Sequence, residues 1–331
     1  MGWFIEAVKD TVTGIFTVGQ RRRNGSHSRR IARLFWSDAM TLTEFFEEHY
    51  LPMNPGLSAG TIKLYHLTIK KFGRFLDRQP TLDDLTDQRV GKFMRFCAER
   101  GNAPRTVNKE RCNLLSMWNL SHKMGVTSRG PLVGKFKVAT RVPTSLAVSD
   151  VRALLVTCAR LQGNTGAKPN STIMRAFVAI QWATGERSGA VALLKWVDVT
   201  GDVLTFRANT RKGGRRAISR KVPKWVMKLI LELDVGTSPF LFPGLSGTNK
   251  TKINKLYKRL FKRAGVSRPK GKMSHLLRST HATMVHKAGG NATESLGHAS
   301  ASTTWDSYLD PRKIDNDFAK FLPDLGFDGG K

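Results

Sequence analysis

The segment SHLLRSTHATMVHKAGGNATESLGHASASTTWDSYLDP, residues 274–311, is the part of the chain around which the other segments are organised. It contains His275 and Arg278 three positions apart, a Gly-His pair that ends at His298, and Tyr308 ten positions after that pair. Because positions i and i+3 lie on one face of a helix, we expect His275 and Arg278 to point at one small target. A proton carrier beside a planar, permanently charged guanidinium suits a phosphate. Tyr308 is then a candidate nucleophile, since a phenol held against a neutralised phosphate can attack it and form a covalent phosphotyrosine.

The composition predicts a polyanionic partner. The chain of 331 residues carries 55 Lys and Arg against 25 Asp and Glu, a formal net charge of +30. The many positive charges repel one another in a compact fold unless an acidic partner offsets them. Nucleic acid is the first candidate for that partner. A membrane surface is the alternative, but the sequence has neither an apolar run long enough to span a bilayer nor a signal-cleavage pattern. We therefore expect no membrane association and a cytoplasmic, nucleoid-associated protein.

The charge and hydrophobic patterns divide the chain into four parts. Residues 1–40 are predicted to be a basic arm or extension, either a solvated tail or a grip on the DNA backbone. Residues 41–128 carry apolar residues at helical spacing, as in 61–78, and are predicted to be a helical domain. Residues 129–144 lose this periodicity and are predicted to be a basic linker. Residues 145–331 are predicted to be a second domain with a C-terminal tail.

A nearly continuous apolar segment, residues 172–183, predicts a buried helix in the second domain. Gly185 breaks that helix and Arg187 follows the break. Burying an Arg alone is costly, so we expect Arg187 either to be paired or to face a charged ligand.

Two short segments, residues 202–208 and 216–222, alternate as strands do. The Gly-Gly pair between them predicts a hairpin turn, and Lys212 lies on that turn. The predicted fold is therefore mainly α with a small antiparallel β-sheet.

Basic residues on the arm, the helices and the linker are expected to contact the DNA backbone. Residues 250–272 add a basic helix and loop with no acid among them. The expected contact residues are Arg21, Arg22, Arg23, Lys63, Lys70, Lys71, Arg105, Lys109, Lys135, Arg141, Lys252 and Lys255.

An ordered set of six residues resembles the tyrosine recombinase (phage integrase) family, and the resemblance covers nearly the whole chain. The set consists of Arg187 in TGERSGAVALLKW, Lys212 in the turn, His275 and Arg278 in HLLR, His298 in LGH and Tyr308 in TTWDSYLDP. The resemblance implies a helical core-binding (SAM-like) DNA-binding domain at 41–128 and a mixed α/β catalytic domain at 145–331, which together form a clamp round DNA.

The activity that the resemblance implies is site-specific recombination. Such an enzyme cleaves and rejoins DNA strands through a 3′-phosphotyrosyl intermediate, and it integrates or excises a mobile element or resolves DNA. The implied partners are double-stranded DNA and further copies of the chain, as a tetramer on paired sites, with an accessory DNA-bending protein left open. No cofactor and no metal are implied, and the cysteines Cys97, Cys112 and Cys158 have no metal-binding or redox spacing.

The resemblance also assigns roles to the residues. Tyr308 would be the nucleophile, with His275 assisting proton transfer to or from it. Arg187 and Arg278 would clamp the non-bridging oxygens of the scissile phosphate, because guanidinium groups stabilise the charge that grows in the transition state. His298 would hydrogen-bond the same phosphate.

Lys212 would protonate the leaving 5′ oxygen, as an ammonium on a turn can reach into a cleft. Arg211 and Lys221 remain alternatives, because the hairpin register can slip by one residue. Family members often have an acid three residues after the first Arg, where this chain has Ala190, so support for Arg187 has to come from elsewhere, and Glu186 is a candidate.

Three alternatives remain open at this point. A DNA-binding regulator or accessory factor of the same fold would have lost cleavage, although the intact set of six residues favours the enzyme. A strand-nicking enzyme of the topoisomerase type is a mechanistic neighbour that would act as a monomer. In residues 312–331 an apolar stripe is expected to dock on a neighbouring subunit, as in the family, or else to fold back on its own domain.

Overall fold

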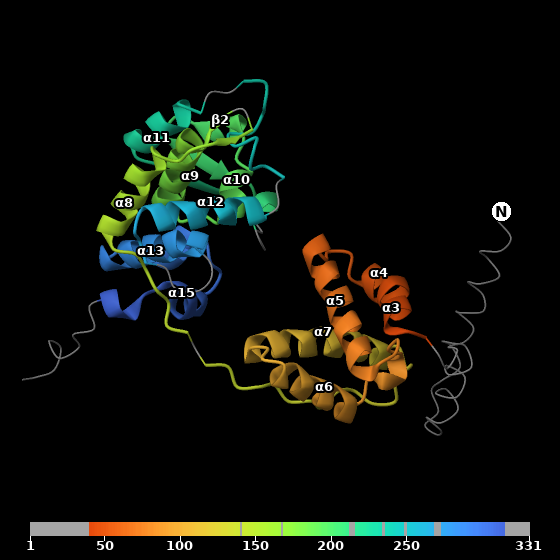
Figure 1. Ribbon diagram of the computed structural model, residues 1–331. Helices are drawn as coiled ribbons and strands as arrows, with labels where there is room; N and C mark the ends of the chain where they lie inside the picture. Colours follow the sequence, from red (N-terminus) through yellow and green to blue (C-terminus); the bar gives the residue numbers. More distant parts are fainter. Residues whose placement is uncertain are drawn as a thin grey trace, which may run out of the picture. The chain divides into compact units, whose positions relative to one another are not determined.

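The computed structural model describes residues 40–139, 141–166, 168–211, 216–233, 236–247, 250–267 and 273–314. Arg21, Arg22 and Arg23, the predicted general acid Lys212 with its Gly-Gly turn, and the tail beyond residue 314 lie outside these ranges. The chain divides into two compact units between Ala139 and Thr140 (Figure 1). Within the described ranges, no helix is both long and apolar enough to cross a bilayer.

The first unit is helical. It contains α3 (Leu42–Phe45), a π-helical turn η1 (Phe46–Tyr50), α4 (Leu51–Met53), α5 (Ala59–Leu76), the 3-10 turn η2 (Leu82–Asp84), α6 (Asp87–Glu99) and α7 (Pro104–Lys123). Side-chain caps begin two of these helices: Thr41 accepts a hydrogen bond from the backbone N–H of Glu44 at α3, and Ser58 accepts one from that of Thr61 at α5. Aromatic rings fill the core: the ring centroids of Phe72 and Phe93 lie 5.1 Å apart.

Residues 129–139, the larger part of the predicted linker 129–144, are held on this first unit. Asn108 on α7 bonds both the N–H and the carbonyl of Phe136, each at 2.9 Å. Arg111, also on α7, donates from Nε to the carbonyl of Val133 at 2.9 Å. The backbone polar groups of an irregular segment are satisfied in this way by the side chains of one helix.

The second unit is built round α9 (Asn170–Thr184), where Phe177 and Ile180 are fully buried. The helices α8 (Val148–Cys158), α10 (Ser188–Ala192), α11 (Lys224–Leu231) and α13 (Met273–Lys287) pack against it (Figure 1). The remaining helices are α12 (Lys250–Arg263), α14 (Ala292–Leu296) and α15 (Ala301–Tyr308), with 3-10 turns η3 (Trp196–Asp198), η4 (Ala208–Thr210) and η5 (Pro311–Lys313).

The sheets of this unit are small and antiparallel. A three-stranded sheet has the order β3 (Val199–Thr200), β4 (Val203–Phe206), β5 (Ile218–Lys221), and Phe206 pairs with Ile218 at the end nearest the turn. A two-stranded sheet joins β1 (Asn164–Thr165) to β2 (Lys168–Pro169). The predicted fold class, mainly α with a small antiparallel β-sheet, is confirmed.

Candidate active site

Helix α13 carries Arg278 into the interior, where its side chain is 1% exposed. Its Nη1 donates to the carbonyl of Gly185 at 2.6 Å, and its Nη2 donates to the carbonyl of Leu296 at 3.0 Å and to Nε2 of His298 at 2.9 Å. The Nε of Arg278 is buried and has no hydrogen-bond partner among the described residues. A donor in that position is suited to an anion that enters the site.

The backbone turn after α9 holds Arg278 in place. Gly185 ends the helix with a left-handed φ of 64°, and a Cβ there would lie 2.5 Å from Cδ2 of His281, so the position requires glycine. His281 is fixed in turn, because its Nδ1 bonds the carbonyl of Trp182 at 2.8 Å. The sharp turn presents Arg187 at the start of α10, half-buried.

Tyr308, at the end of α15, is surrounded by three of the predicted site residues. The ring centroid of His298 lies 4.9 Å from that of Tyr308, and the centroid of His275 lies 6.5 Å from it. The guanidinium carbon of Arg278 lies 5.2 Å from the ring centroid of Tyr308. The Tyr308 side chain is buried, with 8% of its surface exposed. Residues up to 33 positions apart in the sequence thus bring a phenol, a guanidinium and two imidazoles together.

The protonation of His298 follows from its partners. An arginine only donates hydrogen bonds, so Nε2 of His298 accepts from Arg278. Nδ1 therefore carries the proton and donates to Oγ1 of Thr304 at 2.9 Å. Burial, together with the positive charges of Arg278, Arg187 and Arg211, lowers the pKa of His298 from 6.5 to about 4. His298 is neutral near pH 7 until a negative charge enters the site.

The positive charge of Arg187 also acts on the pKa of Arg278. Burial and the nearby charge of Arg187 lower the pKa of Arg278 to about 10, although Glu186 and Tyr308 act in the opposite direction. The charges of the two guanidinium groups repel each other, and a phosphate between them would remove that repulsion.

Lys212 lies outside the described residues, but its two alternatives do not. Arg211 is buried and pairs with Glu186, with 2.9 Å between Nη2 and Oε1. Lys221 is exposed on β5 and lies 3.2 Å from Asp202. Both alternatives thus have acidic partners in the second unit.

Two acidic residues of this region carry structural roles: Glu186, the candidate support for Arg187, and Asp310, to which the sequence analysis gave no role. The carboxylate of Glu186 pairs with Arg211 and lies 3.8 Å from Nη1 of Arg278, whereas it contacts Arg187 through the backbone N–H, at 3.2 Å. Asp310 is fully buried and accepts a hydrogen bond from the N–H of Arg312. The sequence Asp-Pro-Arg at residues 310–312 is typical of a helix start, which is the signal that could have pointed to this role.

The described residues expected to contact the DNA backbone fall into two groups. Lys71 and Lys109 both pair with the buried Glu110, with N–O distances of 2.6 Å and 2.9 Å, and Lys252 donates to the carbonyl of Gly244 at 3.1 Å. The other described members are exposed; these are Lys63, Lys70, Arg105, Lys135, Arg141 and Lys255.

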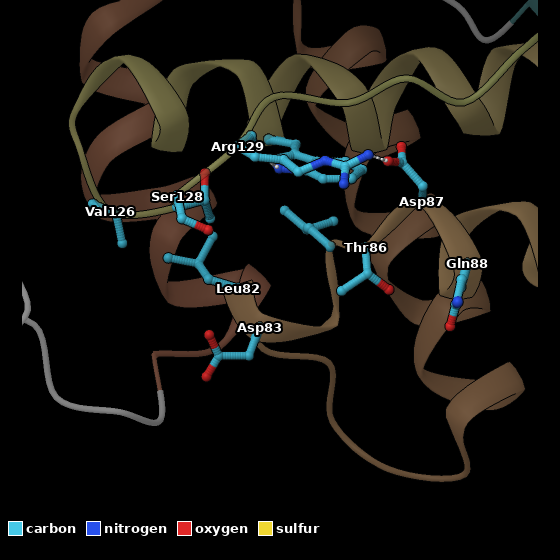
Figure 2. Close-up of a pocket in the computed structure, with 11 residues that line it drawn as sticks. Leu82, Asp83, Thr86, Asp87, Gln88, Val126, Ser128 and Arg129 are labelled. Atoms are coloured by element: carbon cyan, nitrogen blue, oxygen red, sulfur yellow. Dashed lines mark hydrogen bonds and ion pairs between the residues drawn. The ribbon is translucent and has the colours of Figure 1, made fainter.

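A separate cavity of about 420 Å³ lies in the first unit. Figure 2 shows Arg129 on its wall, where Nη2 donates to the carboxylate of Asp87 at 2.7 Å. Leu132 donates its backbone N–H to the same carboxylate at 2.7 Å, so the contacts of this wall hold the chain after α7 against α6. None of the six predicted catalytic residues lines this cavity.

Both units of the chain match models of known protein families. The model of the phage integrase family matches residues 144–314, and the model of the phage integrase SAM-like domain matches residues 41–138. The chain is 28% identical over 275 residues to the tyrosine recombinase XerD of Listeria innocua, which covers 77% of this chain and 90% of that protein. It is 26% identical over 274 residues to XerD of Ralstonia nicotianae, covering 76% of this chain and 84% of that protein.

Solved structures share the fold. The chain resembles a lambda integrase tetramer bound to a Holliday junction, with a TM-score of 0.62, 16% identity, and coverage of 99% of this chain and 88% of that one. It also resembles the XerH site-specific recombinase bound to a palindromic difH substrate, with a TM-score of 0.59, 19% identity, and coverage of 86% and 91%.

The fold and the cluster round Tyr308 define a two-part protein, with a SAM-like helical domain followed by an integrase catalytic domain. The chain belongs to the phage integrase family, the tyrosine recombinases, which break and rejoin DNA at specific sites. The predicted family, fold and enzyme class are confirmed, and the roles of the six site residues stay predictions.

Proposed function

We propose that Tyr308 is the residue that joins covalently to DNA. Its hydroxyl attacks the scissile phosphorus, the bond from phosphorus to the 5′ oxygen breaks, and a 3′-phosphotyrosyl bond forms. The phenol proton passes to His275, and Lys212 donates a proton to the leaving 5′ oxygen. Attack by a 5′ hydroxyl on the phosphotyrosine then reverses each step and rejoins a strand.

Arg187 and Arg278 hold the phosphate in this proposal. The single observation that carries it is the position of Tyr308, whose ring lies 5.2 Å from the Arg278 guanidinium and 4.9 Å from the His298 ring. A phosphate bound to Arg278 is thereby next to the phenol that attacks it. The charge of the phosphate also raises the pKa of His298, so that the ring gains a proton and can donate to a phosphate oxygen.

The proposed substrate is duplex DNA held by the two domains as a clamp, with a tetramer assembled on paired sites. The net charge of +30 supports binding to duplex DNA, and so does the XerH complex with its difH substrate, a structure of similar fold. The lambda integrase tetramer bound to a Holliday junction, also of similar fold, supports the tetramer. Integration or excision of a mobile element and resolution of DNA are all compatible with this chemistry, and an accessory DNA-bending protein is an optional further partner.

A suicide substrate tests the proposal directly. A duplex selected for binding by the wild-type protein is nicked close to the cleaved phosphate, so that the freed strand diffuses away and the covalent complex accumulates. Peptide mapping should find the nucleotide on Tyr308, and Tyr308→Phe should bind the duplex but form no adduct. An adduct on another residue, or one formed by Tyr308→Phe, would remove Tyr308 from this role.

A further inference from the structure

Glu186 is a buried acid among three arginines. Its side chain is 1% exposed, and Oε1 accepts from Arg211, at 3.0 Å from Nε and 2.9 Å from Nη2. Oε2 accepts the backbone N–H of Arg187 at 3.2 Å and lies 3.8 Å from Nη1 of Arg278. One carboxylate thus faces Arg211 with one oxygen and the phosphate-binding arginines with the other.

The other acceptors of Arg278 are neutral. They are the carbonyls of Gly185 and Leu296 and Nε2 of His298. Among the ion pairs of the described residues, Glu186 is the acid that lies beside Arg278. The carboxylate within ion-pair distance of this guanidinium therefore belongs to the residue directly before Arg187.

Arg211 completes a shared frame. Its Nη2 donates to the carbonyl of Leu296 at 3.3 Å, and the same carbonyl accepts from Nη2 of Arg278 at 3.0 Å. Arg211 and Arg278 are thus joined twice, once through the carboxylate of Glu186 and once through the carbonyl of Leu296. The frame engages the Nη atoms of Arg278 and leaves its Nε without a partner among the described residues.

The backbone is shaped to leave room for this frame. Gly297 ends α14 with a left-handed φ of 62°, and a Cβ there would lie 2.7 Å from Nη2 of Arg211. A side chain at residue 297 would therefore force both Ile218, whose Cδ1 would lie even closer to that Cβ, and the Arg211 guanidinium to shift.

We infer that Glu186 and Arg211 are positioning residues for DNA cleavage: the Glu186 carboxylate fixes the Arg278 guanidinium at the phosphate, and Arg211 holds that carboxylate in place. This inference rests on the proposed role of Arg278. It places the acid directly before Arg187, in a chain that has Ala190 three residues after that arginine.

The charge of Glu186 acts on binding and on cleavage in opposite directions. A carboxylate beside the phosphate site weakens the attraction of DNA, because like charges repel. The same carboxylate restrains Arg278, and a restrained donor stabilises the transition state better than a mobile one. A positioning role thus predicts that Glu186→Gln slows cleavage while the affinity for DNA stays equal or rises, whereas loss of folded protein would lower both.

The test measures single-turnover cleavage of the nicked duplex at saturating protein, together with affinity for the intact duplex. Glu186→Gln should cleave about 10- to 100-fold more slowly, less than the loss from removing a direct donor, with no loss of affinity. Arg211→Met should slow cleavage to a similar extent, but its affinity should fall because a positive charge beside the phosphate site is lost. Cleavage by Glu186→Gln within about twofold of the wild-type rate would overturn the inference.

Asp198→Asn is the matched control, because Asp198 is a buried acid of the same unit that pairs with Arg207 at 3.2 Å. It should lower stability and leave the cleavage rate of the folded protein unchanged. If Glu186→Gln behaves as Asp198→Asn does, its role is stability alone and the inference fails.

The double variant Glu186→Gln/Arg211→Met covers the case in which the single variants do not fold. It leaves no buried unpaired charge from this pair, so it should fold. Slow cleavage by the double variant supports the positioning role, and a normal rate overturns it. Arg278→Lys distinguishes failure of the proposed function from failure of the positioning role. Normal cleavage by Arg278→Lys would remove the proposed role of Arg278 itself. Slow cleavage by Arg278→Lys together with normal cleavage by Glu186→Gln would remove the positioning role only.

Discussion

The backbone N–H of Ser145 donates a 2.9 Å hydrogen bond to the carboxylate of Asp310, a residue 165 positions further along the chain. Asp310 is fully buried two residues after Tyr308, and its own N–H donates to Oγ1 of Thr283 on α13 at 3.1 Å. Burial alone would raise its pKa, but hydrogen bonds from Arg312 and Ser145 hold the pKa of Asp310 below its ordinary value. These hydrogen bonds therefore join Ser145, near the start of the second unit, to the residues that directly follow α15, the helix that ends at Tyr308.

Asp310→Asn should destabilise the second unit. Asparagine has the same shape as aspartate, but its NH₂ group replaces one of the oxygens that accept from Ser145 and Arg312. A buried donor is then left without an acceptor, which costs about 1 to 3 kcal/mol. Urea denaturation measures this cost. Arg175→Ala is the control, since the side chains of Arg175 and its partner Glu232 are both exposed and an exposed ion pair contributes below about 1 kcal/mol. Equal stability of the two variants would show that the buried carboxylate does not hold this end of α15.

Arg278→Lys and Arg187→Lys should both cleave slowly although each keeps its charge. Lysine lacks the planar fork, and the loss of one well-aimed donor costs about 100- to 1,000-fold in rate. The rate of covalent complex formation under single turnover is the measurement. A variant that cleaves at a near-normal rate would show that its arginine serves an ion pair instead of the phosphate.

Lys70 and Lys71 are adjacent but should respond differently to substitution. Lys70 is exposed, so Lys70→Ala should weaken DNA binding and reduce the salt dependence by about one counterion if this residue contacts a phosphate. Lys71 neutralises the buried Glu110, so Lys71→Ala should leave the salt dependence unchanged and cost about 1 kcal/mol of stability. Affinities across a salt series, with a urea titration of each variant, distinguish the two. Identical salt slopes for Lys70→Ala and the wild-type protein would remove Lys70 from the DNA contacts.

The depressed pKa of His298 makes stability depend on pH in a defined window. Burial and three nearby arginines lower this pKa from 6.5 to about 4, so the unfolded chain takes up a proton before the folded chain does. The contribution is fully present above about pH 6.5 and is lost as the pH falls toward about 4. His298→Asn should therefore show a shallower fall of the unfolding free energy across this window. His281, whose pKa is lowered by burial, contributes a slope of the same sign, so some pH dependence remains in the variant. An unchanged slope in His298→Asn would contradict the buried neutral imidazole.

The sequence predicted the parts of the site that depend on spacing along one element or on an ordered set of residue types. His275 and Arg278 share α13 at positions i and i+3, and the family resemblance added His298 and Tyr308 from segments further along. The sequence also predicted the buried α9 and the hairpin strands, because a continuous apolar run and an alternation of apolar and polar residues are local signals.

The pairings that the sequence left unspecified join distant segments. Lys71 and Lys109 were expected at the DNA backbone, yet both meet Glu110, which is buried on α7 and has no local signature of that burial. The frame of Glu186, Arg211 and the Leu296 carbonyl likewise needs three segments to meet in space. Residues 129–139 look like a linker by composition, but the side chains of Asn108 and Arg111 that hold them lie on a helix more than 20 positions earlier.

The Nε of Arg278, which has no hydrogen-bond partner among the described residues, has a thermodynamic consequence for the resting enzyme. A buried donor without a partner costs about 1 to 3 kcal/mol, so the DNA-free fold is less stable than its packing would allow. Any ligand that brings an anionic oxygen to that nitrogen raises the melting temperature through mass action. Melting curves of the wild-type protein and of Arg278→Lys, each recorded with duplex, would therefore report whether the phosphate site is occupied. This measurement detects binding of the strand independently of its cleavage.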